Sequence, residues 1–179
     1  MGVHHLAFAS RDTRATHDFY TEAMGFRLAK VEVGATPSGW AKHFFYEIRE
    51  GGPMIAFWEL HDESIPAGHP TAISTGLGLP SWVNHIAFVA ESPVDLDGHR
   101  ERWLAHGHDV MEIDHGWCTS IYALDPNEIL VEFCVTTRAL DAADREEAAR
   151  LLFAPAPPVA KGGKAPRIYR ASEVRSPAA

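Results

Sequence analysis

The sequence predicts an α+β protein made of two tandem βαβββ modules within 179 residues. The segment His5-Leu6-Ala7-Phe8 returns 80 residues later as His85-Ile86-Ala87-Phe88. Both copies alternate small and bulky residues, which is typical of a strand. Each copy is followed by a helix signal and then by three strand-like runs. An internal repeat of this kind indicates two modules that bury one core together.

The first module is predicted to cover residues 1–61. Its helix should begin after Ser10-Arg11-Asp12 and end at Gly25, because the residues between them have apolar side chains at helical spacing. The turn Gly51-Gly52 separates its last two strands. The predicted strands after the helix are Phe26–Val33, Trp40–Ile48 and Pro53–Leu60.

The second module is predicted to cover residues 83–137. Ser92 is the expected N-cap of its helix, Pro93 the first helical residue, and the helix should end near Gly107. The turn Asp125-Pro126-Asn127 precedes its last strand. The predicted strands are His108–His115, Thr119–Leu124 and Ile129–Val135.

Three further segments lie outside the modules. A linker at 62–82 joins them, and a linker of this length is usually functional or wraps a neighbour. Residues 138–153 are predicted to form a C-terminal helix, followed by a Pro-rich basic tail at 154–179. The tail carries five basic residues and one acid, and we interpret it as a solvated arm or as a strap across a partner subunit.

Composition and charge exclude several classes of protein. The net charge is −8, and the body of the chain is acidic, which argues against nucleic-acid binding. No apolar run approaches the roughly 18 residues of a membrane span, and the N-terminus lacks a secretory signal. We therefore expect a cytoplasmic protein without a membrane partner, in which Cys118 and Cys134 are free thiols.

The last strand of each module places a glutamate between bulky apolar residues. Alternate residues of a strand face opposite sides of the sheet. Glu132 therefore points into the concave face if Val131 and Phe133 pack against the helix. Glu59 does the same if its two apolar neighbours pack against the helix of the first module.

Histidines recur in the first strand of each module, where His5 and His85 lie on the predicted concave face. A lone strand histidine is usually structural, but here histidine and glutamate are repeated in both halves. A buried carboxylate or imidazole needs a partner or a metal, because leaving it unpaired costs several kcal/mol. We therefore expect His5, Glu59, His85 and Glu132 to be ligands of one divalent transition metal. His4 is expected to lie outside the site.

These residues and their order resemble the vicinal oxygen chelate superfamily, which includes glyoxalase I, fosfomycin- and bleomycin-resistance proteins and extradiol dioxygenases. The resemblance covers residues 3–136 and implies a cup-shaped mixed sheet. It implies that His5, His85 and Glu132 bind the metal. Glu59 would occupy a position that is glutamate in glyoxalase I and is not a ligand in extradiol enzymes.

A second motif is similar to the signature of extradiol dioxygenases, and it runs from Ile113-Asp114-His115 through Tyr122 to Glu132. The motif departs from the signature at Glu128, where the signature has glycine or proline. By this resemblance His115 is an acid/base residue beside the metal, and Tyr122 is a hydrogen-bond donor to a substrate oxygen.

One histidine of the two-domain extradiol enzymes is missing, because Pro53-Met54-Ile55 stands where they carry an acid/base histidine. His61 or His43 could substitute for it.

Three functions follow from these observations. The leading one is Fe(II)- or Mn(II)-dependent extradiol cleavage of a small catechol-like aromatic substrate by a homodimer, with His115 and Tyr122 as catalytic residues. The alternative is a glyoxalase-like lyase or isomerase that holds Zn(II) or Ni(II) with four ligands, which the presence of Glu59 favours. The third is a metal-free module that binds a small planar ligand.

Overall fold

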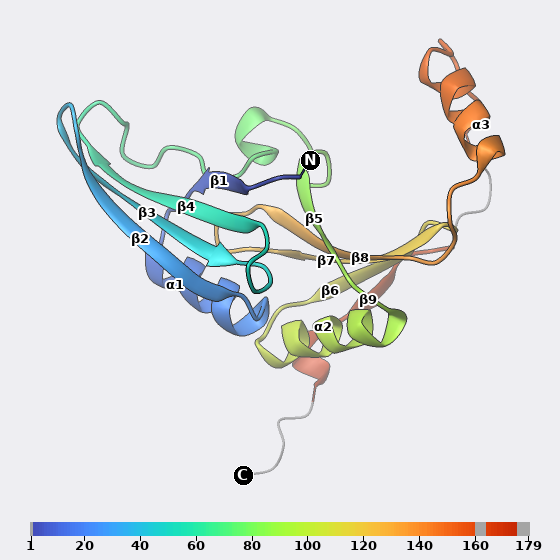
Figure 1. The fold of residues 1–179 in the computed structure, drawn as a ribbon, viewed down its shortest axis with the longest axis horizontal. Helices are drawn as coiled ribbons and strands as arrows, with labels where there is room; N and C mark the ends of the chain where they lie inside the picture. The colour runs from blue at the N-terminus through green and yellow to red at the C-terminus, as the bar shows by residue number, and fades with distance from the viewer. Residues whose placement is uncertain (1, 160–163, 175–179) are drawn as a thin grey trace.

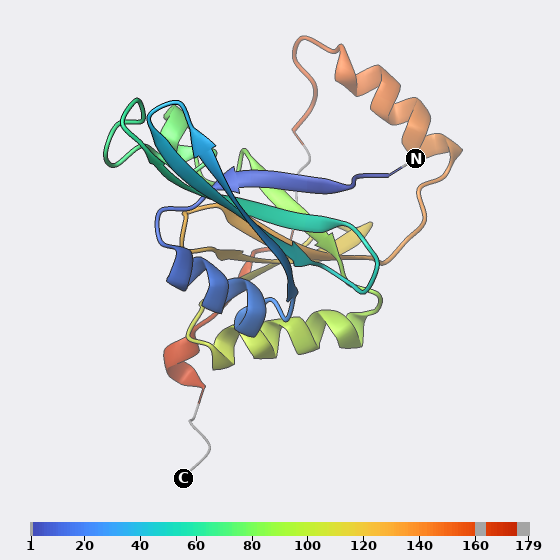
Figure 2. The same ribbon diagram turned by 60° about the vertical axis from the view of Figure 1, so that its left-hand side comes forward.

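The computed structural model describes residues 2–159 and 164–174. Its strands form two mixed sheets, each with helices on one side, and α1 and α2 lie next to each other beneath them (Figures 1 and 2). The α+β prediction of two βαβββ modules is therefore confirmed. Among the described residues, no helix has the length and hydropathy needed to span a membrane.

The first module forms a four-stranded sheet in the order β1-β4-β3-β2, in which β1 is parallel to β4 and the other pairs are antiparallel. Asp12 begins the helix, because its side chain accepts a hydrogen bond from the N–H of Ala15 at 2.9 Å. The elements are β1 (His5–Ala9), α1 (Thr13–Asp18), the π-helical η1 (Phe19–Ala23), β2 (Arg27–Thr36), β3 (Gly39–Glu47) and β4 (Met54–Asp62).

The second module repeats this order as β5-β8-β7-β6 and gains a fifth strand, β9, at its β6 edge. The predicted N-terminus of α2 is confirmed, with Ser92 as the N-cap and Pro93 as the first helical residue. The elements are β5 (His85–Val89), α2 (Pro93–Ala105), β6 (Val110–Asp114), β7 (Cys118–Leu124), β8 (Leu130–Thr136) and β9 (Arg167–Tyr169).

The helix sides of both modules meet in one core, as the repeat predicts. Phe26 packs against Phe88 and Phe133 of the other module, with ring centroids 5.2 and 6.4 Å apart. Tyr20 and Trp103 are completely buried in the same core. The opposite faces of the two sheets, which carry His5, His85 and Glu132, are consequently turned away from this core.

The C-terminal segment differs from both interpretations of the tail. The helix α3 (Ala142–Leu152) extends away from the two sheets (Figures 1 and 2). Instead of leaving the body or crossing to a partner, residues 167–169 then pair with β6 of their own chain. Lys164 and Arg170 bind Asp114 and Asp109 at 2.5 and 2.6 Å. The acidic β6 edge thus attracts the basic tail; tail residues 160–163 and 175–179 lie outside the described part.

Candidate metal centre

The second sheet brings His85 and Glu132 together. The strands β5 and β8 are parallel, with Ala87 directly opposite Glu132, so the two side chains share a face. The Nε2 atom of His85 lies 3.1 Å from Oε2 of Glu132. Val131 and Phe133 pack in the core, which fulfils the condition for Glu132 to point to the opposite face.

The tautomer of His85 leaves a cation-binding position between these two side chains. Its Nδ1 lies 3.1 Å from the backbone carbonyl of Trp82, and a carbonyl only accepts, so Nδ1 carries a proton. A neutral His85 then points the lone pair of Nε2 at the buried carboxylate of Glu132, which is 5% exposed. Two acceptors this close need a proton or a metal ion between them, and a backbone carbonyl on the second nitrogen is typical of metal-binding histidines. The residues present therefore fit a divalent metal.

Tyr122 and His115 form a hydrogen-bonded pair beside Glu132. Tyr122 lies directly opposite Glu132 in the β7–β8 register. Its hydroxyl is 3.0 Å from Nε2 of His115, which follows β6. Burial, together with the nearby Glu132 carboxylate, raises the pKa of Tyr122 to about 12 although the Ser120 hydroxyl opposes this. Tyr122 therefore remains a neutral phenol that can donate a hydrogen bond at physiological pH.

A buried turn fixes the start of β8, the strand that carries Glu132. The Asp125 carboxylate accepts hydrogen bonds from the backbone N–H groups of Asn127 and Ile129 and from the Tyr20 hydroxyl. Burial raises the pKa of Asp125 despite these bonds. Glu128 has a φ of 61°, the left-handed conformation that favours glycine. This explains why a glycine suits the position where Glu128 departs from the extradiol signature.

His5 lies on the corresponding face of the first sheet. Phe8 of the same strand packs against the core, so His5 points away from it. Its ring lies 5.5 Å from that of Phe45 and 6.2 Å from that of His43. Its Nδ1 is 2.8 Å from Nδ1 of His4, so His4 contacts a predicted ligand although the sequence placed it outside the site.

His43 is a polar residue of this face that sequence reasoning named only as a substitute. Its ring stacks on Trp58 at 3.7 Å and is 8% exposed. Its Nε2 is buried and has no hydrogen-bond partner within the described chain. Burial and the neighbouring His5 lower the pKa of His43. The spacing of His43 and Phe45, two residues apart and therefore on one face of β3, was the available signal in the sequence.

The prediction that Glu59 shares the concave face with His5 is wrong. Phe57 of the same strand is fully buried in the core, so Glu59, two residues later, points to the helix side. Its carboxylate accepts hydrogen bonds there from Lys42 at 2.7 Å and from Thr13 of α1 at 2.5 Å. Burial alone would raise the pKa of Glu59, but these donors and His61 lower it to about 2.

His61 lies beside Glu59 on the helix side of the first sheet, away from His5. Its Nε2 is 2.7 Å from Oε1 of Glu59, and its ring stacks on Trp40 at 3.9 Å. Of the two histidines that could replace the missing acid/base residue, only His43 lies on the same face as His5.

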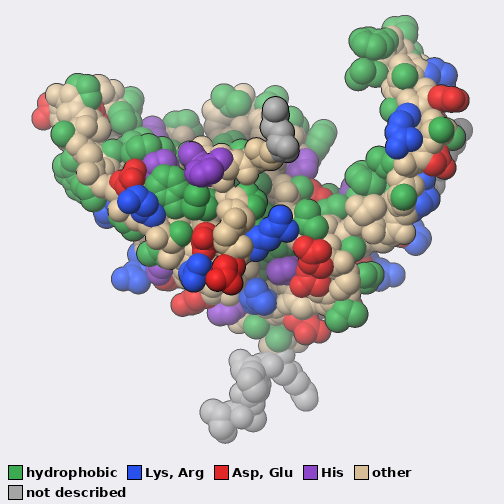
Figure 3. Space-filling view, in the orientation of Figure 1, with side chains coloured by type: hydrophobic (Ala, Val, Ile, Leu, Met, Phe, Trp, Pro, Cys, Tyr) green, Lys and Arg blue, Asp and Glu red, His purple; other side chains and the backbone are tan. Residues whose placement is uncertain are grey.

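One chain does not assemble the predicted ligands into a single cluster. Within residues 2–159 and 164–174, no three His, Cys, Asp or Glu side chains come within reach of one metal ion. His85 and Glu132 form a pair on the second sheet, and His5 lies apart from them on the first. Figure 3 shows histidine side chains along the upper, hollowed side of the molecule.

Comparison with known proteins agrees with this architecture. Residues 2–133 match the model of the Glyoxalase/Bleomycin resistance protein/Dioxygenase superfamily. A domain of that description from Frankia sp. EAN1pec is 20% identical with a TM-score of 0.54, over 76% of this chain and 98% of the other. The fosfomycin resistance protein FosX of Listeria monocytogenes is 24% identical with a TM-score of 0.52, over 76% and 94%.

A third solved structure, lactoylglutathione lyase from Agrobacterium tumefaciens, is 18% identical with a TM-score of 0.51, over 75% of this chain and 92% of the other. No curated protein sequence matches the chain. At these identities the solved structures establish a common fold, and the proteins they describe have different activities.

Proposed function

The chain belongs to the Glyoxalase/Bleomycin resistance protein/Dioxygenase superfamily, and on this basis we propose that it is a metal-dependent extradiol dioxygenase that cleaves a catechol-like aromatic substrate. The observation that carries the proposal is the position of Nε2 of His85, 3.1 Å from the Glu132 carboxylate and beside the Tyr122–His115 pair. Two acceptors that face each other suit a divalent cation, and the adjacent donor pair suits an oxygen-rich substrate.

Three protein ligands fit better than four. His5, His85 and Glu132 make the two-histidine, one-carboxylate set that leaves open positions on Fe(II) or Mn(II). The four-ligand lyase or isomerase would need Glu59 as well. Glu59 is on the helix side of its sheet and is neutralised by Lys42, so that alternative loses its main support.

The metal site is completed by a second copy of the chain. His85 and Glu132 come from the second module of one copy, and His5 comes from the first module of the other. Each of β1 and β5 is hydrogen-bonded to one strand and has a free edge in the described chain. A homodimer with two-fold symmetry would form two such sites.

His115 and Tyr122 would handle protons and orient the substrate. When Nε2 of His115 carries a proton, it donates a hydrogen bond to the Tyr122 oxygen. The phenol O–H of Tyr122 is then free to donate to a substrate oxygen. Alternatively, a neutral His115 with Nε2 unprotonated accepts a proton that a catechol hydroxyl passes through Tyr122. His5, His85 and Glu132 would hold the Fe(II) or Mn(II) ion, which would supply Lewis acidity and the redox chemistry with O₂.

The face around His5 suits a flat ring. The rings of Trp58, His43 and Phe45 are stacked or tilted against one another at 3.7–4.0 Å. Aromatic faces of this kind bind planar apolar molecules well.

Oxygen uptake tests the activity. Protein loaded anaerobically with Fe(II) is exposed to a panel of catechols, with Zn(II)-loaded protein as the control. We expect oxygen consumption with a yellow ring-fission product from the iron form alone. Fully loaded protein that consumes no oxygen with any catechol would overturn the dioxygenase proposal.

Complementation tests the shared site. His5→Ala and Glu132→Gln proteins should each be inactive. When the two are unfolded and refolded together, about half of the dimers should be mixed, and one of the two sites in each mixed dimer carries neither substitution. The mixture should therefore regain about a quarter of the wild-type activity. A site built within one chain would gain no activity on mixing.

A further inference from the structure

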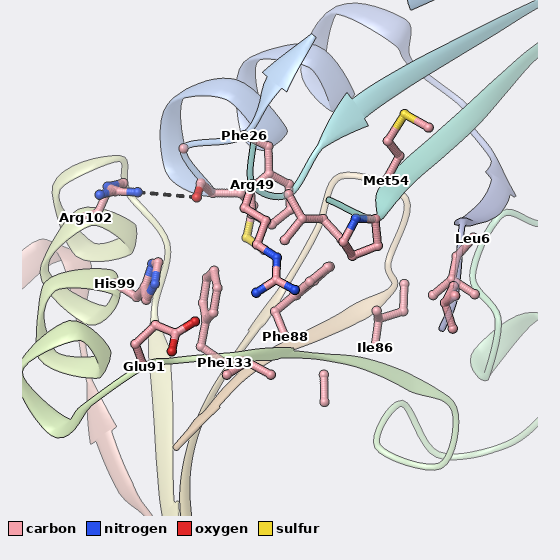
Figure 4. Close-up of a pocket in the computed structure, with 17 residues that line it drawn as sticks. Leu6, Phe26, Arg49, Met54, Ile86, Phe88, Glu91, His99, Arg102 and Phe133 are labelled. Carbon is pink, nitrogen blue, oxygen red and sulfur yellow. Dashed lines mark hydrogen bonds between the residues drawn. The ribbon is translucent and has the colours of Figure 1, made fainter. Parts of the chain in front are cut away.

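A cavity of about 420 Å³ lies between the two modules, beside the edge of β5 (Figure 4). Four consecutive residues of β5, Ile86 to Val89, line it, so both faces of this strand border the cavity. None of His5, His85 and Glu132 lines it, so the cavity is distinct from the candidate metal centre. Its apolar wall is formed by Leu6, Phe26, Met54, Ile86, Phe88 and Phe133.

Arg49 places a positive charge at this apolar wall. It follows β3, and its guanidinium group points into the cavity in Figure 4. No hydrogen bond or ion pair of this side chain is formed within residues 2–159 and 164–174. The second arginine of the lining, Arg102, donates to the carbonyl of Met24 at 3.3 Å and is already engaged. A free guanidinium beside apolar side chains suits a carboxylate, which it binds through two parallel hydrogen bonds.

His99 supplies a second polar atom without a partner. Its ring stacks on Phe133 at 3.6 Å, its side chain is 14% exposed, and its Nδ1 is buried without a hydrogen bond in the described chain. Burial lowers the pKa of His99 despite the nearby Asp95, so the ring is neutral at pH 7. A buried nitrogen of this kind costs stability unless something pairs with it.

Glu91 is the acidic residue of the lining and limits the choice of ligand. It lies near His99 on the α2 side of the cavity, away from the point where Leu6 closes the opposite end (Figure 4). Arg49 and Arg102 outnumber it, so the rim carries an excess of positive charge. The rim therefore favours a ligand with one negative charge over a neutral or cationic ligand.

We propose that this cavity binds a small apolar molecule with a single carboxylate, such as a medium-chain fatty acid. The carboxylate pairs with Arg49, and the hydrocarbon chain lies against Ile86, Phe88 and Phe133. The volume is within the range of small-molecule sites. Because both modules line the cavity, the ligand stabilises their relative position and raises the stability of the folded chain by mass action.

Methionine methyl groups report on this site. The full chain, labelled with ¹³C at its methionine methyls, is titrated with decanoate below the concentration at which micelles form. Met24 and Met54 line the cavity, whereas Met111 lies on β6. We expect decanoate to shift the Met24 and Met54 signals and to leave that of Met111 unchanged. Shifts at Met111 alone, or at no methionine, would overturn the proposal.

The role of the carboxylate is tested with ligand and protein variants. Decanol and decylamine should bind at least about tenfold more weakly than decanoate. Arg49→Gln should weaken decanoate binding by about tenfold without changing decanol binding, and Arg49→Lys should keep part of the affinity. Arg14→Gln removes the same charge at an exposed site on α1 and should have no effect. Equal binding of decanoate and decanol by the wild type would overturn the proposal that Arg49 recognises a carboxylate in this cavity.

Sedimentation in the same titration distinguishes a ligand site from an interface. We expect the oligomeric state to stay unchanged as decanoate binds. Dissociation of dimers in step with the Met24 and Met54 shifts would overturn the proposal and assign the cavity to a second copy of the chain. Mn(II) binding by Arg49→Gln should equal that of the wild type. A failure of decanoate to bind can therefore be told apart from a failure of the metal site that the proposed function needs.

Discussion

Glu132 and Ala56 occupy equivalent positions in the two sheets: Glu132 lies directly opposite Ala87, and Ala56 lies directly opposite Ala7. The alanines Ala7 and Ala87 are themselves equivalent residues of the repeated strand. The second sheet thus carries a carboxylate where the first carries a methyl group. The two modules share a fold but offer different groups to a metal, and this asymmetry underlies the first prediction.

Glu132→Gln should weaken Mn(II) binding more than about 100-fold, because even partners that only orient a metal ligand are worth 10–100-fold. Glu59→Gln should bind Mn(II) within about twofold of the wild type, because Glu59 points to the helix side. Calorimetric titration measures both, with circular dichroism as the control for folding. Full metal retention in Glu132→Gln would contradict the assignment.

The neighbouring histidines His4 and His5 provide a matched pair. His5→Ala should abolish metal binding by the dimer. His4→Ala should weaken metal binding by only about tenfold, the low end for a partner that orients a ligand, since His4 only touches His5 through Nδ1. Metal content after gel filtration is the measurement. Equal losses in the two variants would remove His5 as a specific ligand.

The hydrogen bonds that Glu59 accepts from Thr13 and Lys42 make the stability of the fold depend on pH. The folded-state pKa of Glu59 is about 2, below the ordinary value of 4.5, so its ionised form stabilises the fold above pH 4.5, and this stability is lost as the pH falls towards 2. At pH 7 the wild type should exceed Glu59→Gln by about 1 kcal/mol in free energy of unfolding. Urea denaturation should show that the difference shrinks towards pH 3. A difference that grows on acidification would contradict the ion-pair assignment.

Glu128→Gly tests the left-handed turn before β8. The φ of 61° is strained for glutamate, whereas glycine adopts it freely. The change also removes an exposed ion pair with Arg11, 3.0 Å in length, which is worth little. Glu128→Gly should therefore raise the free energy of unfolding by about 0.5–1 kcal/mol. Glu128→Ala, which loses the pair and keeps the strain, should not be more stable than the wild type.

Tyr169 tests the docking of the tail on β6. Its ring lies 4.8 Å from the Arg100 guanidinium, and its hydroxyl donates to Glu112 at 3.3 Å. Tyr169→Ala should lower the free energy of unfolding by about 1–2 kcal/mol, and Tyr169→Phe should lower it by less. Thermal denaturation measures both. A tail that stays in solvent would make the two variants as stable as the wild type.

The local order of the fold could be read from the sequence because local patterns encode it. The repeated strand, the Ser92-Pro93 helix start and the Asp125 turn depend on residues close together in the chain. Alternation along β8 also placed Glu132 correctly, because its neighbours Val131 and Phe133 are both apolar enough to be core residues. The pairing of His85 with Glu132 follows from the strand order of one module.

The face of Glu59 could not be read in the same way. Phe57, Trp58 and Leu60 are all apolar, so alternation alone allows either face. Only the packing of Phe57 against Tyr20, with ring centroids 4.7 Å apart, decides which side is buried. The docking of Tyr169 on β6 is likewise a contact across 57 residues that no local pattern contains.

The sequence by itself thus determined the two modules, their strands and helices, and the outward faces of His5, His85 and Glu132. The tertiary structure decided how the modules meet. Phe26 of the first module packs against Phe88 and Phe133 of the second, which joins the helix sides and leaves His5 apart from His85 and Glu132. This orientation depends on the fit of side chains far apart in the chain, because burial of apolar surface is non-directional and periodicity specifies only which face is buried.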